Sequence, residues 1–482
     1  MSHVVQMSEA KSNLLRRYLH GRQALASTNS SVITKRTRDS AAPLSLQQQQ
    51  VWLNSQQTGR PPFYNESITI YRKGPLDLGV LERCVAEILK RHEAWRTSYD
   101  VLNGQPVQII HQAPTCFPLP VVDLRPLSES EREEKAVELA AKEVRHPFDL
   151  RKFPLFRVTV VRLGDEEYRL YVSVHQIIID GVTAYHVLLP ELVRLYEAFS
   201  HGKPSPLPEL PIQCADFACW QRDWLQGEVL ASKLAYWRKQ LEGAPTRLGW
   251  PNDRPRPARQ SFRGTIRPFT LPRDLSHQVR KFSQTEGVTS FVTLLTGFYI
   301  LLHRYTGQSD IVVGTVSPAG RKQLEVQPLM GYFLNPVPLR LDLSGNPTVR
   351  ELLFRTQKVS VGALSYDDVP FERLVEELKP RTDPSRNPFF QVAASLEPSM
   401  PDVDPSWDLT PMDIENGGGR WDLYLVWDDR PSGMIGRVQY NPDLLEAATI
   451  DRMLEDQDTL LREIVANPQR GLSNLTLNAN PS

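Results

Sequence analysis

The stretch Val174-His175-Gln176-Ile177-Ile178-Ile179-Asp180-Gly181 decides how this chain folds. Before it, Tyr168–Val174 is an alternating run rich in β-branched and aromatic residues, which predicts a β-strand. After Gly181, apolar residues return at helical spacing as far as Tyr196. The octet is therefore predicted to be a strand end, a tight loop and a helix start. Gly181 gives the loop backbone freedom, and Asp180 is placed to cap free amides or to pair with a buried cation.

Composition narrows the class of protein. The chain has 482 residues, of which 40% are hydrophobic and 23% charged, so it is globular and long enough for two or three domains. Its net charge of zero argues against a nucleic-acid binder held by electrostatics. We find no long uncharged apolar run and no signal-peptide core, and therefore predict no membrane association and a cytoplasmic location. The four cysteines are too few and too irregular for a disulfide framework or a metal site.

The octet carries a recognisable signature. His175, Asp180 and Gly181 form a His-x-x-x-x-Asp-Gly pattern at a strand-to-helix junction. This pattern resembles the His-His-x-x-x-Asp-Gly signature of the condensation domains of nonribosomal peptide synthetases. The second histidine of that signature, which the family uses at the reaction centre, is replaced here by Gln176.

Other segments resemble motifs of the same family and occur in the expected order. They are Ser45-x-x-Gln48-x-x-x-Trp52, Arg91–Thr97, Pro147–Arg157, Cys214–Trp220, Met330–Pro336, Asp367–Leu374 and Ser385–Val392. Four positions depart from the family pattern: Trp95, Cys214, Pro336 and Tyr366. Each motif alone is a weak signal, but together they extend the resemblance over nearly the whole chain.

The resemblance and the local composition together suggest three parts. Residues 1–42 are an arm, with an amphipathic basic helix over residues 8–24 and a Ser/Thr/Ala-rich linker over residues 25–42. That helix is either a solvated segment or a docking helix for a carrier protein. Residues 43–213 form an N-terminal lobe, and residues 214–482 form a C-terminal lobe. The two lobes are expected to meet near residues 213–262.

The resemblance implies an α/β fold of the mixed α+β type, with two chloramphenicol-acetyltransferase-like lobes arranged as a V-shaped pseudo-dimer. A tunnel would run between the lobes. An upstream donor carrier protein and a downstream acceptor carrier protein would each extend a phosphopantetheine arm into this tunnel. The domain itself would then bind no cofactor and no metal. We expect a monomer that has been excised from a larger synthetase.

The resemblance also implies roles for particular residues. The candidate catalytic residues are Gln176 and His175, and the candidate structural residues of the active site are Asp180 and Gly181, with Arg321 as the partner of Asp180. Candidates for the tunnel lining are Ser317, Asn335 and Trp220. An amide side chain cannot take up a proton, but it can orient an amine or donate to a carbonyl oxygen. General base catalysis contributes roughly 10²–10⁴-fold, whereas positioning two reactants contributes more.

Other bases and other functions remain open. His186, Ser317 and Tyr366 are stand-in candidates for the missing base, although we expect His186 to be packed within its apolar helix. One hypothesis is an amide-forming acyltransferase with an altered centre. The alternative is a catalytically silent platform that binds carrier proteins or recruits a tailoring enzyme. Ester formation, dehydration and cyclisation are further chemistries of the superfamily.

Overall fold

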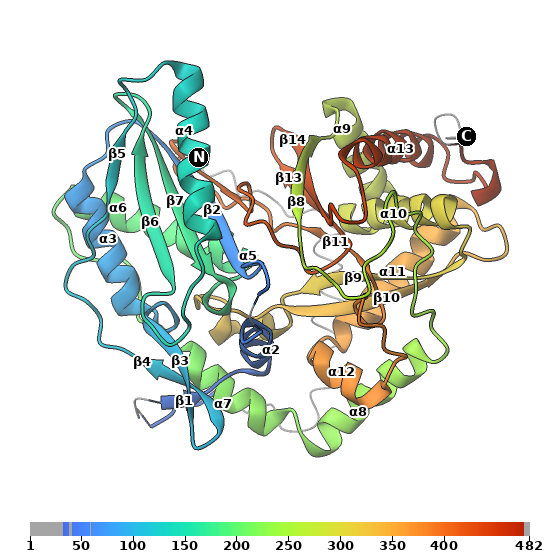
Figure 1. Ribbon diagram of the computed structural model, residues 1–482, viewed down its shortest axis with the longest axis horizontal. Coiled ribbons are helices and arrows are strands. Elements are labelled where there is room, and N and C mark those ends of the chain that lie inside the picture. Colours follow the sequence, from blue (N-terminus) through green and yellow to red (C-terminus); the bar gives the residue numbers. More distant parts are fainter. Residues whose placement is uncertain (1–31, 38–40, 58, 477–482) are drawn as a thin grey trace.

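The computed structural model describes residues 32–37, 41–57 and 59–476, and it shows two lobes side by side that open into a V (Figure 1). One lobe is drawn in blue to green and the other mainly in yellow to red. This is the predicted mixed α/β fold with two lobes. The docking helix predicted over residues 8–24 lies outside the described residues.

The first lobe is built on a five-stranded sheet with the order β12-β2-β7-β6-β5. Its strands are β2 (Asn65–Lys73), β5 (Val121–Asp123), β6 (Phe156–Arg162), β7 (Glu167–His175) and β12 (Trp407–Pro411). All neighbours are antiparallel except β5 and β6. A smaller sheet joins β1 (Ala41–Pro43), β3 (Thr97–Leu102) and β4 (Gln105–Ile110).

Helices cover both faces of the five-stranded sheet, because side chains alternate between its faces. Val161 and Tyr171 face α4 (Glu129–Arg145), with which they share a small core. Their strand neighbours Val160 and Leu170 belong instead to the main core of the lobe. Helices α3 (Leu78–Arg91) and α6 (Leu189–Ser200) contribute to that main core, as does α2 (Leu46–Ser55).

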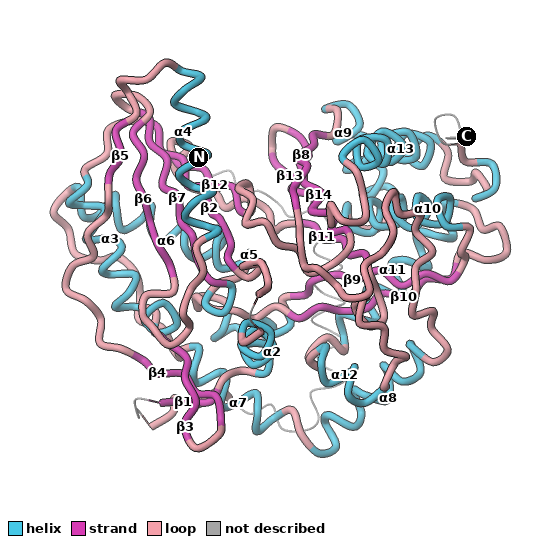
Figure 2. The backbone as a smooth tube through the Cα atoms, in the orientation of Figure 1, coloured by secondary structure: helices cyan, strands magenta, loops and turns pink. Residues whose placement is uncertain are grey.

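The second lobe is built on a six-stranded sheet with the order β10-β9-β11-β13-β14-β8. Its strands are β8 (Thr265–Thr270), β9 (Asp310–Ser317), β10 (Asn335–Asp342), β11 (Val392–Leu396), β13 (Leu423–Arg430) and β14 (Gly433–Tyr440). Its helices are α8 (Gly227–Leu241), α9 (Arg273–Glu286), α10 (Ser290–Thr306), α11 (Val349–Ser365), α12 (Phe371–Leu378) and α13 (Ala447–Ala466). The helices lie around the sheet (Figure 2).

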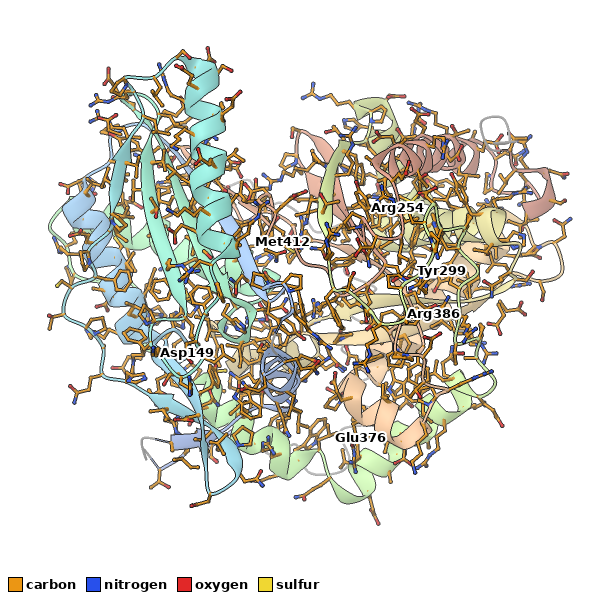
Figure 3. The ribbon with its side chains drawn as sticks, in the orientation of Figure 1. Asp149, Arg254, Tyr299, Glu376, Arg386 and Met412 are labelled. Carbon is orange, nitrogen blue, oxygen red and sulfur yellow. The ribbon has the colours of Figure 1, made fainter. Side chains whose placement is uncertain are left out.

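Side chains fill the interior of the second lobe (Figure 3). Helix α10 is apolar and largely buried. Tyr299 on this helix is buried, and its hydroxyl donates to the carbonyl oxygen of Leu339 on β10 at 2.7 Å. That hydrogen bond ties the helix to the sheet and satisfies the one polar atom of the ring.

Several segments that follow residue 213 pack in the first lobe, so dividing the chain between residues 213 and 214 does not separate the two cores. Helix α7 (Cys214–Trp224) places Phe217 in the core of the first lobe. Strand β12 comes from the second half of the chain, yet it pairs with β2. Tyr332 and Phe333 from the second half also pack in the first core. The chain therefore passes between the two lobes more than once, and no single residue marks the boundary between them.

The linker predicted over residues 25–42 is wrong for residues 32–37. Ile33 is buried in the core of the first lobe. Arg36 forms ion pairs with Glu93 at 2.9 Å and with Asp216 at 3.1 Å. Low hydrophobicity suggested a solvated segment, but one apolar and one charged anchor are enough to fix this short stretch on the lobe.

Within the described ranges, no single helix is long and apolar enough to cross a membrane. The bent pair α9–α10 passes that test by length and composition only. No group of three His, Cys, Asp or Glu side chains in these ranges is placed to hold a metal ion.

Candidate active site

The octet lies where the two lobes meet and has the predicted local structure. Strand β7 ends at His175, a 3₁₀ turn covers Gln176–Ile178, and α5 (Gly181–Thr183) follows. A π-helical turn over Ala184–Leu188 then leads directly into α6. The backbone thus turns sharply between Gln176 and Asp180 and presents the two side chains to different surroundings.

Asp180 joins the two lobes through a buried ion pair. Its Oδ1 accepts from the amide of Thr183 at 2.7 Å, which caps α5. Arg321, from the second half of the chain, donates from Nη2 to Oδ1 at 3.0 Å and from Nε to Oδ2 at 3.3 Å. The amide of Phe333 donates to Oδ2 at 3.1 Å. The predicted pairing of Asp180 with Arg321 is confirmed.

The guanidinium of Arg321 is also saturated. Its Nη1 donates to the carbonyl oxygens of Val326, Gln327 and Leu329 at 3.3, 3.2 and 3.0 Å. Its Nη2 also donates to the hydroxyl of Thr183 at 2.5 Å. The side chains of Arg321 and Asp180 are 4% and 0% exposed. A buried pair with every donor and acceptor used is a structural clasp.

His175 is held inside the first lobe. Its Nδ1 accepts from the amide of Ile177 at 3.2 Å, so Nε2 carries the hydrogen and faces the hydroxyl of Ser55 at 3.4 Å. Burial lowers its pKa to about 3, which keeps the ring neutral and makes it a very weak base. The sequence grouped His175 with the catalytic residues. Its contacts instead give it a structural role.

Gln176, which stands where the signature has its second histidine, has only part of its hydrogen-bonding capacity used. It is 4% exposed, and its backbone amide donates to the carbonyl oxygen of Tyr64 at 2.7 Å. Its Nε2 donates to Oε1 of Glu66. Its Oε1 is buried and has no hydrogen-bond partner among the described residues. The side-chain amide is therefore held at its nitrogen, and its oxygen is left without a donor.

Glu66 is a site residue that the sequence did not indicate. It lies near the start of β2, directly after Asn65, which pairs with His175 in the neighbouring strand. Burial raises the pKa of its carboxyl to about 7, and Glu397 and Asp180 add to the rise against the opposing charges of Arg420 and Arg437. A charged residue near the head of a strand that is otherwise largely apolar or hydroxyl-bearing was the available signal. Its contact with Gln176, 110 residues away, could not be read from the sequence.

Two of the three predicted tunnel residues make structural contacts, and their place in a tunnel stays a prediction. The hydroxyl of Ser317 donates to Asp367. The amide nitrogen of Asn335 donates to the carbonyl oxygens of Asp367 and Val369, both at 2.7 Å, and its oxygen accepts from the amide of Phe371 at 3.1 Å. Both side chains are buried. They fix the loop before α12, and neither lines the cavity beside Trp220 and Lys322 or the one beside Arg238 and Phe389.

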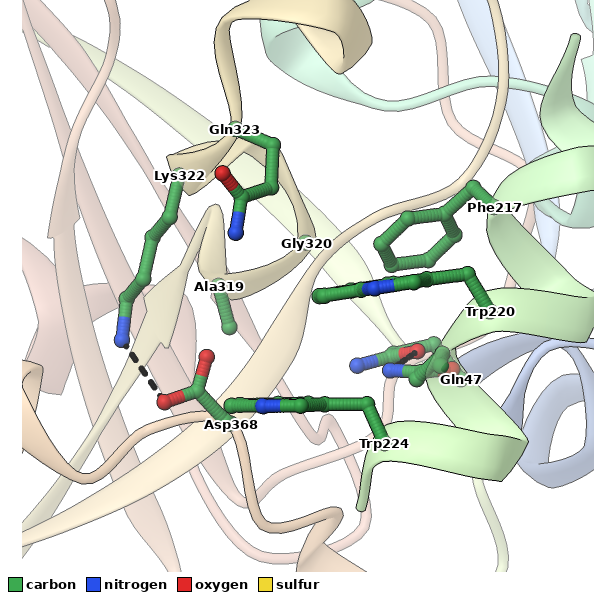
Figure 4. A pocket seen from close by; sticks show the side chains of 10 residues that line it. Gln47, Phe217, Trp220, Trp224, Ala319, Gly320, Lys322, Gln323 and Asp368 are labelled. Carbon is green, nitrogen blue, oxygen red and sulfur yellow. Dashed lines mark hydrogen bonds and ion pairs between the residues drawn. The ribbon is translucent and has the colours of Figure 1, made fainter. Parts of the chain in front are cut away.

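Trp220 does line a cavity, which lies between α7 and residues 319–323 and has a volume of about 130 Å³ (Figure 4). Its ring stacks on that of Trp224 with the centroids 5.1 Å apart and the planes at 8°. The two indoles and Phe217 face the turn that carries Lys322. The cavity thus has one aromatic wall from the first lobe and one polar wall from the second.

The stand-in bases do not gather at the octet. His186 is exposed rather than packed, because the π-helical turn carries it on the outer side of the helix. Tyr366 stacks on Tyr236 with the ring centroids 4.1 Å apart, at the end of α11. Ser317 is bound to Asp367. Glu66 is the ionisable side chain that contacts Gln176.

Comparisons with known proteins agree with this architecture. The chain is 40% identical over 464 residues to a linear gramicidin synthase of Brevibacillus parabrevis, a match that covers 95% of this chain and 6% of that protein. The X-domain from teicoplanin biosynthesis, solved alone and in a complex with OxyB, is 25% identical. It aligns with a TM-score of 0.79 over 93–94% of this chain and 100% of that chain.

A third similarity concerns the fold alone. The first condensation domain of the calcium-dependent antibiotic synthetase, solved with a substrate analogue, aligns with a TM-score of 0.79 at 20% identity, over 91% of this chain and 100% of that one. The family model described as "Condensation domain" matches residues 39–480. The chain therefore belongs to the condensation domain family of nonribosomal peptide synthetases.

Proposed function

We propose that this domain forms an amide bond between two carrier-bound substrates and that Gln176 orients the attacking amine. The amine of the acceptor attacks the thioester carbonyl of the donor, a C–N bond forms, the C–S bond breaks, and the thiol leaves. Both substrates arrive on phosphopantetheine arms, so the domain needs no cofactor of its own. The chain spans 6% of the length of the linear gramicidin synthase that it matches.

The unpaired oxygen of Gln176 carries this proposal. A buried acceptor without a donor costs about 1–3 kcal/mol, and Gln176 Oε1 is the one such atom on the octet, although other buried side chains in the described ranges also have unpaired polar atoms. Glu66 holds the other end of the amide, so the oxygen cannot swing away to find a partner. An amine N–H that donates to this oxygen would satisfy it. The same hydrogen bond would direct the nitrogen lone pair away from Gln176 and toward an incoming carbonyl carbon.

Positioning is sufficient for this chemistry in principle. A thioester is already activated toward an amine, and holding two reactants in attack geometry contributes up to about 7–11 kcal/mol. The base that the family places at this position contributes roughly 10²–10⁴-fold. The loss of a histidine therefore slows such a reaction without abolishing it.

A second candidate function is a platform that binds a partner without catalysis. The X-domain from teicoplanin biosynthesis, 25% identical to this chain, has been solved in a complex with OxyB. A platform has no use for a polar centre that is buried and unsatisfied. Gln176 therefore favours the condensing function.

The test is product formation on loaded carriers, measured by intact mass. Parent protein should form the amide. Gln176→Ala should slow single-turnover formation by roughly 5–30-fold, the scale of one lost hydrogen bond of about 1–2 kcal/mol. Gln176→His should match or exceed the parent rate, because the histidine would meet Glu66. The matched control is Gln284→Ala on the exposed face of α9, which should leave the rate unchanged. Parent protein that binds carriers but forms no amide would establish the platform.

A further inference from the structure

Glu66 is arranged differently from the other carboxylates that face the octet. It is only partly buried, and its Oε1 accepts from Gln176. Its second oxygen, Oε2, has no hydrogen bond to any residue of the described ranges, and no cation forms an ion pair with it there. A carboxylate with one oxygen bound to Gln176 and the other without a hydrogen bond in the described ranges can accept a proton.

The charged groups around Glu66 are mostly neutralised by one another. Asp180 is paired with Arg321, and Glu397 is paired with Arg437. Arg420 faces Glu66 without forming an ion pair with it, and its guanidinium lies over the ring of Trp421, 4.7 Å from the centroid. Burial then dominates and raises the pKa of Glu66 to about 7. The carboxyl is therefore divided between its two protonation states near neutral pH.

We propose that Glu66 accepts the proton that the acceptor amine loses, and so replaces the base that Gln176 cannot be. This inference rests on the proposed function. The amine donates one N–H to Oε1 of Gln176 and attacks the thioester carbon. As the C–N bond forms, the nitrogen transfers its other proton to the carboxylate of Glu66, directly or through one water. The C–S bond breaks, and the departing thiolate takes a proton from the Glu66 carboxylic acid. Thioester and amine thus give amide and thiol, and Glu66 returns to its starting form.

This division of labour explains why an amide can stand at the position of a base. Gln176 supplies the acceptor that aims the amine, and its own N–H fixes the carboxylate beside it. Protonated Glu66 has no place for another proton. The reaction should therefore slow at low pH.

The experiment is the pH dependence of single-turnover amide formation by parent and Glu66→Gln. The acceptor amine itself titrates near 7.7–8.0, the usual range for α-amino groups, and does so in both proteins. The parent should show a second group with an apparent pKa of about 7, and its rate should fall more steeply below that pH. Glu66→Gln should lose the second group and be roughly 10²-fold slower at pH 8. Glu134→Gln on the exposed face of α4 is the matched control and should keep the parent profile.

A second variant tests whether Glu66→Gln loses rate because a base is missing or because the protein is misfolded. The double variant Glu66→Gln with Gln176→His should recover most of the lost rate, because histidine restores a titrating base. Loss of the second titration together with this rescue supports Glu66 as the proton acceptor. If Glu66→Gln keeps the parent profile while amide still forms, this inference fails and the proposed function stands. If the parent forms no amide at any pH, both fail.

Discussion

Gln176 and Asp180 lie four residues apart on the same loop, and each forms a polar pair with a residue from elsewhere in the chain. The two pairs differ in how many of their hydrogen-bonding atoms have partners. Asp180 and Arg321 use every available donor and acceptor, and they join the two lobes. Gln176 and Glu66 share one hydrogen bond, and each has an oxygen that accepts none from the residues described. Gln176 and Asp180 are both buried, at 4% and 1% exposed, so the exposure of these two loop residues does not explain the difference.

Under the proposed function, Asp180 and Arg321 stabilise the fold, whereas Gln176 and Glu66 take part in the reaction. A buried ion pair is tolerated when its hydrogen bonds are complete, and removing one partner is then expensive. An incomplete buried pair costs free energy at rest and is retained where a substrate completes it. The clasp should therefore respond to mutation mainly in stability, and the Gln176–Glu66 pair mainly in rate and pH dependence.

The largest expected effect is on the clasp. Asp180→Ala leaves the guanidinium of Arg321 buried without its anion and removes the cap of α5. The free energy of unfolding should fall by about 3–5 kcal/mol. Denaturant or thermal unfolding measures the change. Asp123→Ala is the control, because Asp123 pairs with Arg125 at 2.7 Å on the surface, and exposed pairs contribute about 0–1 kcal/mol. Equal losses in the two variants would contradict the role of the clasp.

A smaller effect is expected from Glu66→Gln, and it depends on pH. The pKa of Glu66 is raised in the folded protein from 4.5 to about 7, so the folded state holds this proton more tightly than the unfolded state. The stabilisation is complete below about pH 4.5 and is lost as the pH rises through about 7. The parent should therefore lose about 1–3 kcal/mol relative to the variant between pH 5 and pH 8.

The comparison with the variant is needed because the pKa of Glu372 is also raised to about 7 by burial. Burial also raises the pKa of Asp367 and of Asp458 to about 6, so the parent alone reports the sum of several carboxyls. Unfolding free energies of parent and Glu66→Gln at several pH values isolate Glu66. If the difference in unfolding free energy between parent and Glu66→Gln does not change with pH, the pKa of Glu66 is not raised by folding and the environment described here is wrong.

The sequence predicted the backbone structure of the octet and its buried ion pair, but not the carboxyl that contacts Gln176. The strand, loop and helix of the octet follow from local periodicity and from the family signature. The pairing of Asp180 with Arg321 was predicted from the family's motif order and is present. Glu66 was missed because its partner Gln176 lies in the turn that follows the neighbouring strand β7, and the register of two strands cannot be read from one sequence.

Other contacts could not be read from the sequence for similar reasons. Ser317 and Asn335 were expected to line the tunnel, which stays a prediction, and their hydrogen bonds fix the loop before α12. His186 was expected to be packed, but a π-helical turn shifts the helical phase, and the side chain is exposed. In each case a tertiary contact or a local helix irregularity decided the orientation, and neither leaves a clear mark on composition or periodicity.

The most direct test of the contrast replaces both members of the incomplete pair. The double variant Glu66→Met with Gln176→Met keeps the side-chain lengths and removes the unsatisfied polar atoms. Replacing both partners of a buried polar pair by apolar groups of similar shape is about neutral or stabilising. Its unfolding free energy at pH 8 should therefore equal or exceed that of the parent within about 1 kcal/mol, while single-turnover amide formation falls at least as far as in Glu66→Gln. A protein that is strongly destabilised and yet forms amide at the parent rate would show that this pair, like the clasp, only holds the fold.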